Sequence, residues 1–237
     1  MFGRKYNLRP TGYVYGNGRS VFRLVAARDF ENSRCGMVRE GTQGGVVASN
    51  KNLSHEGGAW VGYDGVVLDD SRIEGDAYVK GQVTGQSKVT GCAYIDGRAD
   101  VADSYIGGDT IIGDGTFVHV LCCLIEGNRA TVRQGATIKE CLVAGNVVIS
   151  NEANVRLRKI TGVGAYPNID TAASWERRAV HDRAMKSCRF ETIVKVEFYR
   201  MLTAKIGPLP EETIRAYDES AMYHRLPPSG HCSLDLK

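Results

Sequence analysis

The chain contains 237 residues, of which 43% are hydrophobic and 24% are charged. These values are typical of a globular protein and argue against a chain that is disordered throughout. The formal net charge of +3 conceals an uneven distribution, since residues 66–155 carry 7 basic and 12 acidic side chains, whereas residues 156–205 carry 11 and 5. No apolar run approaches the roughly 18 residues that a membrane span requires.

The N-terminus and the cysteines indicate a cytoplasmic protein. The first ten residues, MFGRKYNLRP, carry charge but no apolar stretch behind it, unlike a signal peptide. The seven cysteines are odd in number and lack the CxxC spacing of a metal site. We therefore expect reduced thiols, no metal, no cofactor and no association with a membrane.

Residues 6–30 predict a β-hairpin. A run rich in Tyr and Val is followed by the turn sequence GNGR and then by VFRLVA. We expect residues 1–65 to form an N-terminal β cap, which would protect the strand edge at that end of the next segment.

Residues 66–160 repeat with a period of about six. This step is neither the 3.6-residue period of a helix nor the alternation of a single strand. It predicts a mainly β solenoid of about five coils, in which β-branched side chains point inward and stack about 18 residues apart. The expected inward residues are Ile73, Val79, Val83, Val89, Ile95, Val101, Ile106, Ile112, Val118, Ile125, Val132, Ile138, Val143, Ile149, Val155 and Ile160.

Small residues and glycines mark the coils of this repeat. Small residues stand two positions before many of the β-branched ones, at Ala77, Ser87, Ala93, Ala99, Thr110 and Thr116. Of the 28 glycines, 26 lie at or before Gly164. Since Gly, Asp and Asn tolerate the backbone of tight corners, we expect most of these glycines to lie where the coil turns.

Residues 161–237 differ in composition and are expected to contain a linker, a helical segment and a tail. Apolar residues follow helical spacing between Trp175 and about Ile206, although the sequence FETIVKVEF within this range also alternates like a strand. Gly207 and Pro208 predict the end of this helix, and a second short helix is expected from Pro210.

One stretch before the repeat resembles a known family. Gly44 and Gly45 are followed by Asn52-Leu53-Ser54, Glu56-Gly57, Trp60 and Tyr63-Asp64, and then by hexapeptide repeats. This order resembles the YdcK-like β-helix proteins of bacteria and their phages, over roughly residues 20 to 155. The residues from about 165 onward match no part of that family.

The resemblance implies a single-stranded left-handed β-helix with an N-terminal cap, often encoded by a phage or prophage. It implies little about activity. With such an origin, a plausible task is to bind and inhibit a host protein, such as a defence protein, in the cytoplasm of the host cell. Our leading hypothesis is therefore a non-enzymatic protein-binding module.

His119 carries the alternative hypothesis of an enzyme. Hexapeptide-repeat acyltransferases use a histidine between neighbouring coils, and His119 is the single histidine of the repeat. Because it follows the inward Val118, its side chain is expected to point outward, as a catalytic base requires. A γ-class carbonic anhydrase is excluded, since it needs three histidine ligands for zinc.

The cysteines and aspartates of the repeat have structural interpretations. Cys123 and Cys141 are 18 residues apart and are expected to stack, with Cys122 beside them, as small apolar side chains. Five aspartates either occupy corners of the coil or form an acidic strip toward a basic partner. They are Asp96, Asp100, Asp103, Asp109 and Asp114.

The C-terminal segment carries a basic cluster that is a candidate for partner binding. Its side chains could contact an acidic protein, nucleic acid or only water. We favour a protein partner over nucleic acid and expect a homodimer through the C-terminal region. The cluster consists of Arg177, Arg178, Arg183, Lys186 and Arg189.

Overall fold

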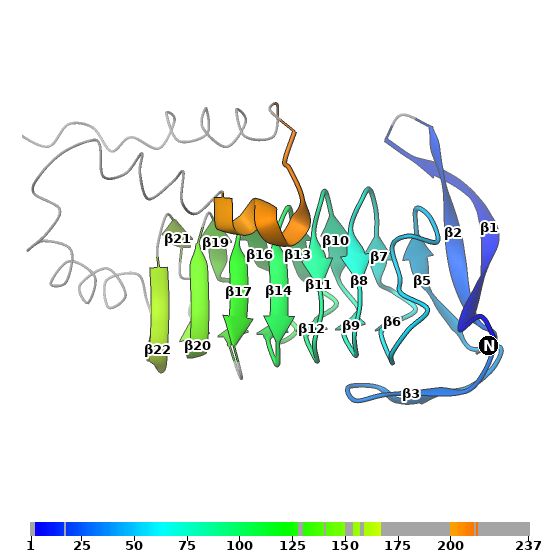
Figure 1. Cartoon of the computed structure of the whole chain (residues 1–237), viewed down its shortest axis with the longest axis horizontal. Helices are drawn as coiled ribbons and strands as arrows, with labels where there is room; N and C mark the ends of the chain where they lie inside the picture. The colour runs from blue at the N-terminus through cyan, green and yellow to red at the C-terminus, as the bar shows by residue number, and fades with distance from the viewer. Residues whose placement is uncertain are drawn as a thin grey trace, which may run out of the picture. The chain divides into compact units, whose positions relative to one another are not determined.

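A computed structural model describes residues 3–16, 18–127, 130–139, 141–149, 154–156, 159–166, 200–210 and 212. The main unit, residues 1–207, is a β-solenoid of about six turns. It has an antiparallel β cap at its N-terminal end and a short helix near the C-terminus, so the predicted mainly β fold is confirmed (Figure 1).

Each coil contributes a short parallel strand to each of three faces. The first face contains β5 (Gln43–Val47), β7 (Val66–Val67), β10 (Gln82–Thr84), β13 (Ala99–Ala102), β16 (Val118–Leu121), β19 (Thr137–Lys139) and β21 (Asn154–Arg156). The second face contains β8 (Arg72–Ile73), β11 (Lys88–Val89), β14 (Tyr105–Gly108), β17 (Leu124–Gly127) and the first halves of β20 (Leu142–Ile149) and β22 (Lys159–Tyr166).

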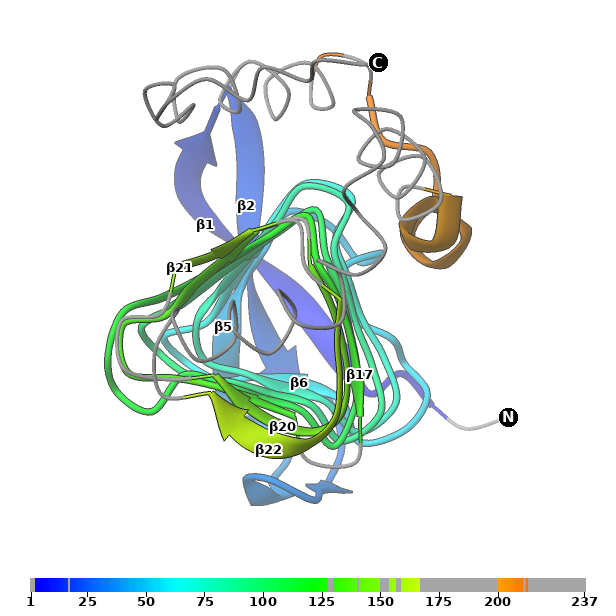
Figure 2. The same cartoon turned by 90° about the vertical axis from the view of Figure 1, so that its left-hand side faces the viewer.

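The third face contains β6 (Trp60–Val61), β9 (Tyr78–Val79), β12 (Tyr94–Ile95), β15 (Ile111–Ile112), β18 (Thr131–Val132) and the second halves of β20 and β22. Seen down its axis, the coil is triangular (Figure 2). The chain passes clockwise from the first to the second and third faces as it advances toward the viewer, which makes the solenoid left-handed.

The interior consists of stacked β-branched side chains, as the six-residue period predicts. On the first face, for example, Val67 pairs with Val83, and Val83 pairs with Val101. All three side chains are fully buried. The spacing along the chain is 16 to 18 residues here, so each layer adds one ring of apolar contacts to its neighbour.

Val118 is buried as expected, but its strand contains a second inward residue, Val120. Val120, rather than Val118, pairs with Val101, and Val118 pairs with the small residue Ala99. Both valines are buried, and Thr116, two positions before Val118, is exposed. The corner before Val118 is longer, and its residues 114–117 are exposed, with Phe117 at 67%.

The expected N-terminal hairpin is present as β1 (Tyr6–Tyr15) and β2 (Arg19–Ala26). Strand β2 pairs antiparallel with β5, so the hairpin continues the first face beyond the first coil. Pro10 lies on the edge strand β1, where its missing N–H weakens the edge as a template for another strand.

A second hairpin, β3 (Phe30–Asn32) and β4 (Gly36–Val38), was not predicted. It runs along the corner between the second and third faces (Figure 1). The amide of Asn32 donates to the carbonyl oxygens of Gly58 and Asp76, at 3.0 Å each. Arg34 donates to the carbonyl of Cys92 and pairs with Asp109, so the hairpin connects successive coils.

The glycine pair of the family-like stretch has a packing role. A β-carbon on Gly44 would lie 2.6 Å from the Trp60 ring, and one on Gly45 would lie 2.3 Å from the carbonyl oxygen of Gly65. Trp60 is buried and makes an edge contact with Phe30. The absent side chains thus allow the first coil to close around Trp60.

Residues 200–206 are helical, and the N–H of Gly207 donates to the carbonyl of Thr203. Gly207 has a φ of 94°, the left-handed conformation of a helix C-cap. The predicted helix end at Gly207 and Pro208 is therefore confirmed. Residues 208–237 form a second unit, of which residues 208–210 and the helical residue 212 are described. The remainder of both predicted helices lies outside the described residues.

Candidate binding site on the second face

The outer side of the second face changes character along the solenoid. Strand alternation points one residue of each pair inward, as with Ile73, and its neighbours outward. In β14 and β17 the outward residues are Tyr105 and Leu124, which are nevertheless only 7% and 5% exposed. In β8 the outward residue is Arg72, whose side chain is 62% exposed.

The helical residues 200–206 account for the buried half of this face. Leu202 is fully buried. The Lys205 ammonium lies 3.5 Å from Glu126 and 4.8 Å from the centre of the Tyr105 ring. The second face therefore already contacts one segment of its own chain, through Lys205.

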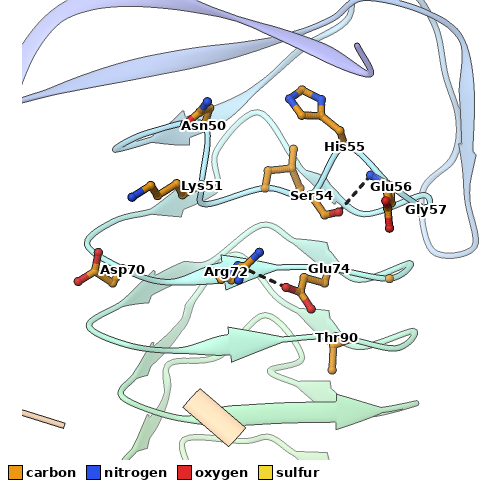
Figure 3. Close-up of a pocket in the computed structure, with 12 residues that line it drawn as sticks. Asn50, Lys51, Ser54, His55, Glu56, Gly57, Asp70, Arg72, Glu74 and Thr90 are labelled. Atoms are coloured by element: carbon orange, nitrogen blue, oxygen red, sulfur yellow. Dashed lines mark hydrogen bonds and ion pairs between the residues drawn. The ribbon is translucent and has the colours of Figure 1, made fainter. Parts of the chain in front are cut away.

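The other half of the face, next to the N-terminal cap, is an open polar hollow of about 1100 Å³ (Figure 3). Its floor is formed by outward side chains of neighbouring coils. The lining residues are Asn50, Lys51, Leu53, Ser54, His55, Glu56, Gly57, Asp70, Arg72, Glu74, Gly75 and Thr90.

Glu74 is the centre of an ion-pair network in the hollow. Its carboxylate lies 3.3 Å from Nε of Arg72 and 2.9 Å from Nζ of Lys88, on the next coil. The Glu74 side chain is only 25% exposed. Its charge is thus neutralised within the face, while Arg72 still presents the outer end of its guanidinium group.

Other charged side chains of the hollow make no direct polar contact with the described part of the chain. Among the described residues, the Lys51 ammonium and the carboxylates of Glu56 and Asp70 make neither a hydrogen bond nor an ion pair through their side chains. All three residues are exposed. The hollow therefore offers charges of both signs at its surface.

The cap positions the rim of the hollow. The His55 ring stacks on Tyr6 at 4.2 Å between centroids, and its Nδ1 accepts the N–H of Lys5 at 3.4 Å. Burial, followed by the charges of Lys5 and Arg4, lowers the pKa of His55. The ring is thus neutral at pH 7 and serves as part of a fixed wall.

The lining differs from that of an apolar ligand pocket and from that of a nucleic-acid surface. Pockets for small molecules are mostly apolar, whereas Leu53 is the only aliphatic side chain larger than a methyl group in this lining. A nucleic-acid surface would have an excess of positive charge, but here three acidic side chains outnumber two basic ones, with His55 neutral. Within the described residues, no group of three or more His, Cys, Asp or Glu side chains is placed to hold a metal ion.

His119 lies on the first face, away from this hollow. Its side chain points outward, as predicted, and is 48% exposed. Nδ1 of His119 lies 3.7 Å from Oδ2 of Asp100, which belongs to the preceding coil. The two side chains form a surface pair, and sequence reasoning did not anticipate the role of Asp100 in it.

The cysteines stack as expected. The N–H of Cys141 donates to Sγ of Cys123 at 3.4 Å, and the Cys141 thiol donates to the carbonyl of Lys139 at 3.1 Å. Burial raises the pKa of Cys123. Because reactive cysteines need an accessible thiolate, these residues act as packing groups of the interior.

The five aspartates of the repeat do not form one strip. Asp100 lies within a strand of the first face, while the others lie at three different corners. Asp103 accepts the N–H of Gln86, and Asp114 accepts the N–H of Gln134. These contacts support the interpretation of corner residues that hold neighbouring coils together.

The basic cluster Arg177, Arg178, Arg183, Lys186 and Arg189 lies outside the described residues. Its role in binding a protein or nucleic acid therefore stays a prediction. The residues of the hollow were missed by sequence reasoning. A signal was present, because the six-residue period assigns Asp70, Arg72 and Glu74 to outward positions around the inward Ser71 and Ile73.

No protein-family profile matches the sequence, and no curated protein is significantly similar to it. The described part of the chain contains no helix with the length and apolar character needed to cross a membrane.

Proposed function

We propose that this protein is a non-enzymatic binding module whose β-solenoid docks a segment of a partner protein in the hollow of the second face. The observation that carries the proposal is the set of exposed charged side chains that make no hydrogen bond or ion pair with the described residues, Lys51, Glu56 and Asp70, grouped with Arg72 in one open hollow. A rigid solenoid loses little conformational entropy on binding, which favours this use.

The neighbouring helical residues support the same proposal. Residues 200–206 lie on the second face through Leu202 and the pair of Lys205 with Glu126. The face is thus able to hold a chain segment by side-chain contacts alone. The resemblance to phage and prophage proteins supports a protein of the host cell as the partner, with inhibition as the consequence.

A capture experiment tests this proposal. Tagged protein is incubated with host lysate, and the bound proteins are quantified by mass spectrometry for the wild type and for Arg72→Glu. A specific partner should be depleted by Arg72→Glu and retained by Arg133→Glu, a matched charge reversal at an exposed residue of the third face. Equal capture by all three proteins would show that the hollow does not bind the partner.

Self-association through the C-terminal region belongs to the same proposal. Light scattering should give a dimer for the full chain and a monomer for a chain that ends at Ala165. A dimer of the shortened chain would place the contact elsewhere.

The pair of His119 and Asp100 favours a second candidate, an acyltransferase. With the carboxylate 3.7 Å from Nδ1, Nε2 of His119 could take the proton of an amine or hydroxyl acceptor. The acceptor would attack a thioester, and the proton would pass to the released thiol. His119→Ala should then abolish acetyl-CoA-dependent acylation, and a wild type that binds no acyl-CoA rejects this candidate.

A further inference from the structure

Two basic segments meet at the end of the N-terminal cap. Arg4 and Lys5 immediately precede β1, and Ala27 and Arg28 immediately follow β2. The N–H of Ala27 donates to the carbonyl oxygen of Lys5 at 2.9 Å, so the two segments lie side by side (Figure 1). Three cationic side chains, those of Arg4, Lys5 and Arg28, are therefore gathered at this end of the cap.

The charges of this group act on one another. Burial, followed by the charge of Arg28, lowers the pKa of Lys5. Burial, followed by the charges of Lys5 and Arg4, lowers the pKa of His55. Asp76 is the carboxylate that acts on Lys5 in the opposite direction. Three cations thus share the influence of one nearby carboxylate, which leaves an excess of positive charge.

Arg28 is the cation for which the protein supplies no acceptor. Its Nε is buried and makes no hydrogen bond within the protein, and its side chain forms no ion pair with the described residues. Asp29, the next residue, is already held by Arg39 at 2.8 Å and by the N–H of Glu40 at 2.7 Å. A buried cationic donor without an acceptor is destabilising, so an anion from outside the chain would complete this group.

The other two cations can contribute in different ways. Lys5 is fully buried, and its ammonium donates to three backbone carbonyl oxygens at 2.9–3.4 Å. Its three protons are thus in use, and it can attract a ligand through its charge alone. Arg4 is exposed, and its side chain makes neither a hydrogen bond nor an ion pair with the described residues, so its guanidinium group is available to a ligand.

We propose that Arg4 and Arg28 bind a phosphate or sulfate group at this end of the cap, with the charge of Lys5 adding to the attraction. A guanidinium group donates two parallel hydrogen bonds to such an oxyanion, and its two negative charges match the excess of positive charge. This site lies beyond the proposed function, which depends on Arg72. The group can belong to a free ion or to a phosphorylated side chain of a partner protein, because both present the same oxygens.

Titration of the full chain with inorganic phosphate tests the site. At constant ionic strength, phosphate should bind the wild type and raise its melting temperature, whereas chloride should not. Arg28→Gln should bind phosphate at least about tenfold more weakly, and Arg4→Gln about threefold more weakly. Arg9→Gln changes an exposed arginine of β1 and is the matched control, which should bind like the wild type.

Two results would overturn the proposal. They are a wild type that binds no phosphate, and equal binding by the wild type, Arg28→Gln and Arg4→Gln. If Arg28→Gln does not fold, Arg4→Gln keeps the test decisive, because changes at exposed residues have little effect on stability. Arg72→Glu should bind phosphate as the wild type does, so failure of the hollow as a docking site would leave this result unchanged.

A second titration identifies the source of the group. It uses a short peptide that contains one phosphoserine. Tighter binding of this peptide than of inorganic phosphate would assign the site to a phosphorylated partner, and equal binding would assign it to a free ion. In either case Arg28→Gln must weaken the binding, and an unchanged affinity of Arg28→Gln for the peptide rejects the site.

Discussion

Two corners of the solenoid form the same left-handed backbone turn with different residue types. At the first corner, between the first and second faces, the left-handed positions are Asp69, Gly85, Asp103 and Cys122. At the second corner, between the second and third faces, they are Gly57, Gly75, Gly91 and Gly108. All eight residues have φ between 47° and 69°.

The first corner tolerates side chains because they take part in the stacking. Asp69 accepts the N–H of Gly85, and Asp103 accepts that of Gln86. Beside them a column of small polar side chains links the coils, as the N–H of Ser104 donates to Ser87 Oγ. The column starts at the buried Asn52, whose amide donates to the carbonyls of Asp69 and Ser71.

The second corner has no room for side chains. A β-carbon on Gly57 would lie 2.3 Å from the carbonyl oxygen of Gly75. At the N-terminal end of this second corner lies the buried Lys5, whose ammonium donates to the carbonyls of Glu56, Gly57 and Ala59. One corner is thus held by side-chain hydrogen bonds, and the other by close backbone contact beneath a buried charge.

The largest effect is expected where glycine is required twice, by its φ and by its surroundings. In Gly91→Ala the new β-carbon would lie 2.6 Å from the carbonyl oxygen of Gly108, at a φ of 69°. We expect a loss of about 3–4 kcal/mol in the free energy of unfolding, measured by urea denaturation. Gly115→Ala is the control, since its φ is 89° but nothing lies near its β-carbon. It should cost about 1 kcal/mol, and equal losses would show that close contact at the second corner is unimportant.

The buried charge at the end of the second corner predicts a pH dependence. Burial, followed by the charge of Arg28, lowers the pKa of Lys5 from 10.5 to about 8. The unfolded chain then binds more protons than the folded one between these values, so stability should rise by about 2 kcal/mol from pH 8 to pH 10. Urea denaturation across this range should show the rise in the wild type but not in Lys5→Gln.

Tyr6 is expected to end this rise in stability above pH 10. Burial raises its pKa from 10.0 to about 12, so its contribution to stability is lost as the pH rises beyond 10. Tyr6→Phe should not show this loss of stability above pH 10.

The Lys5 prediction has its own contrary outcome. If the stability of the wild type and of Lys5→Gln changes in parallel between pH 8 and pH 10, Lys5 is solvated rather than buried.

A smaller effect is expected in the polar column of the first corner. Ser104 Oγ accepts the N–H of Cys123 at 2.9 Å and donates to the carbonyl of Ala102. Ser104→Ala leaves that buried N–H without an acceptor and should cost about 1–2 kcal/mol. Ser104→Cys should cost less than about 1 kcal/mol, because Cys123 Sγ already accepts the N–H of Cys141. If Ser104→Ala is as stable as Ser104→Cys, the column contributes packing only.

Much of this architecture could be predicted from the sequence, because a solenoid repeats one local rule. The six-residue period identified the inward residues from Ile73 to Ile112. It also identified Val118, which is buried, but it missed Val120, which pairs with Val101, because an insertion within a corner changes the count without changing the local residue types. The β3–β4 hairpin was missed because its contacts, such as those of Asn32 with Asp76, join positions far apart in the chain.

The candidate site was less accessible to sequence reasoning than the fold. A periodic pattern shows that Arg72 faces outward, but it does not show that the cap and the neighbouring coil leave a hollow there. The nearness of Asp100 to His119 could be read only once the register of β13 and β16 was known. Sites of this kind depend on which coil lies beside which.

The third corner, between the third and first faces, has a consequence for how such proteins diversify. The chain crosses it in four residues from Val79 to Val83 but in eight from Ile112 to Val120, and the stacked interior remains in register on both sides. The number of residues in the third corner can therefore vary. Foreign loops, epitopes or whole small domains could be inserted between Gly113 and Phe117, where the scaffold already tolerates additional residues.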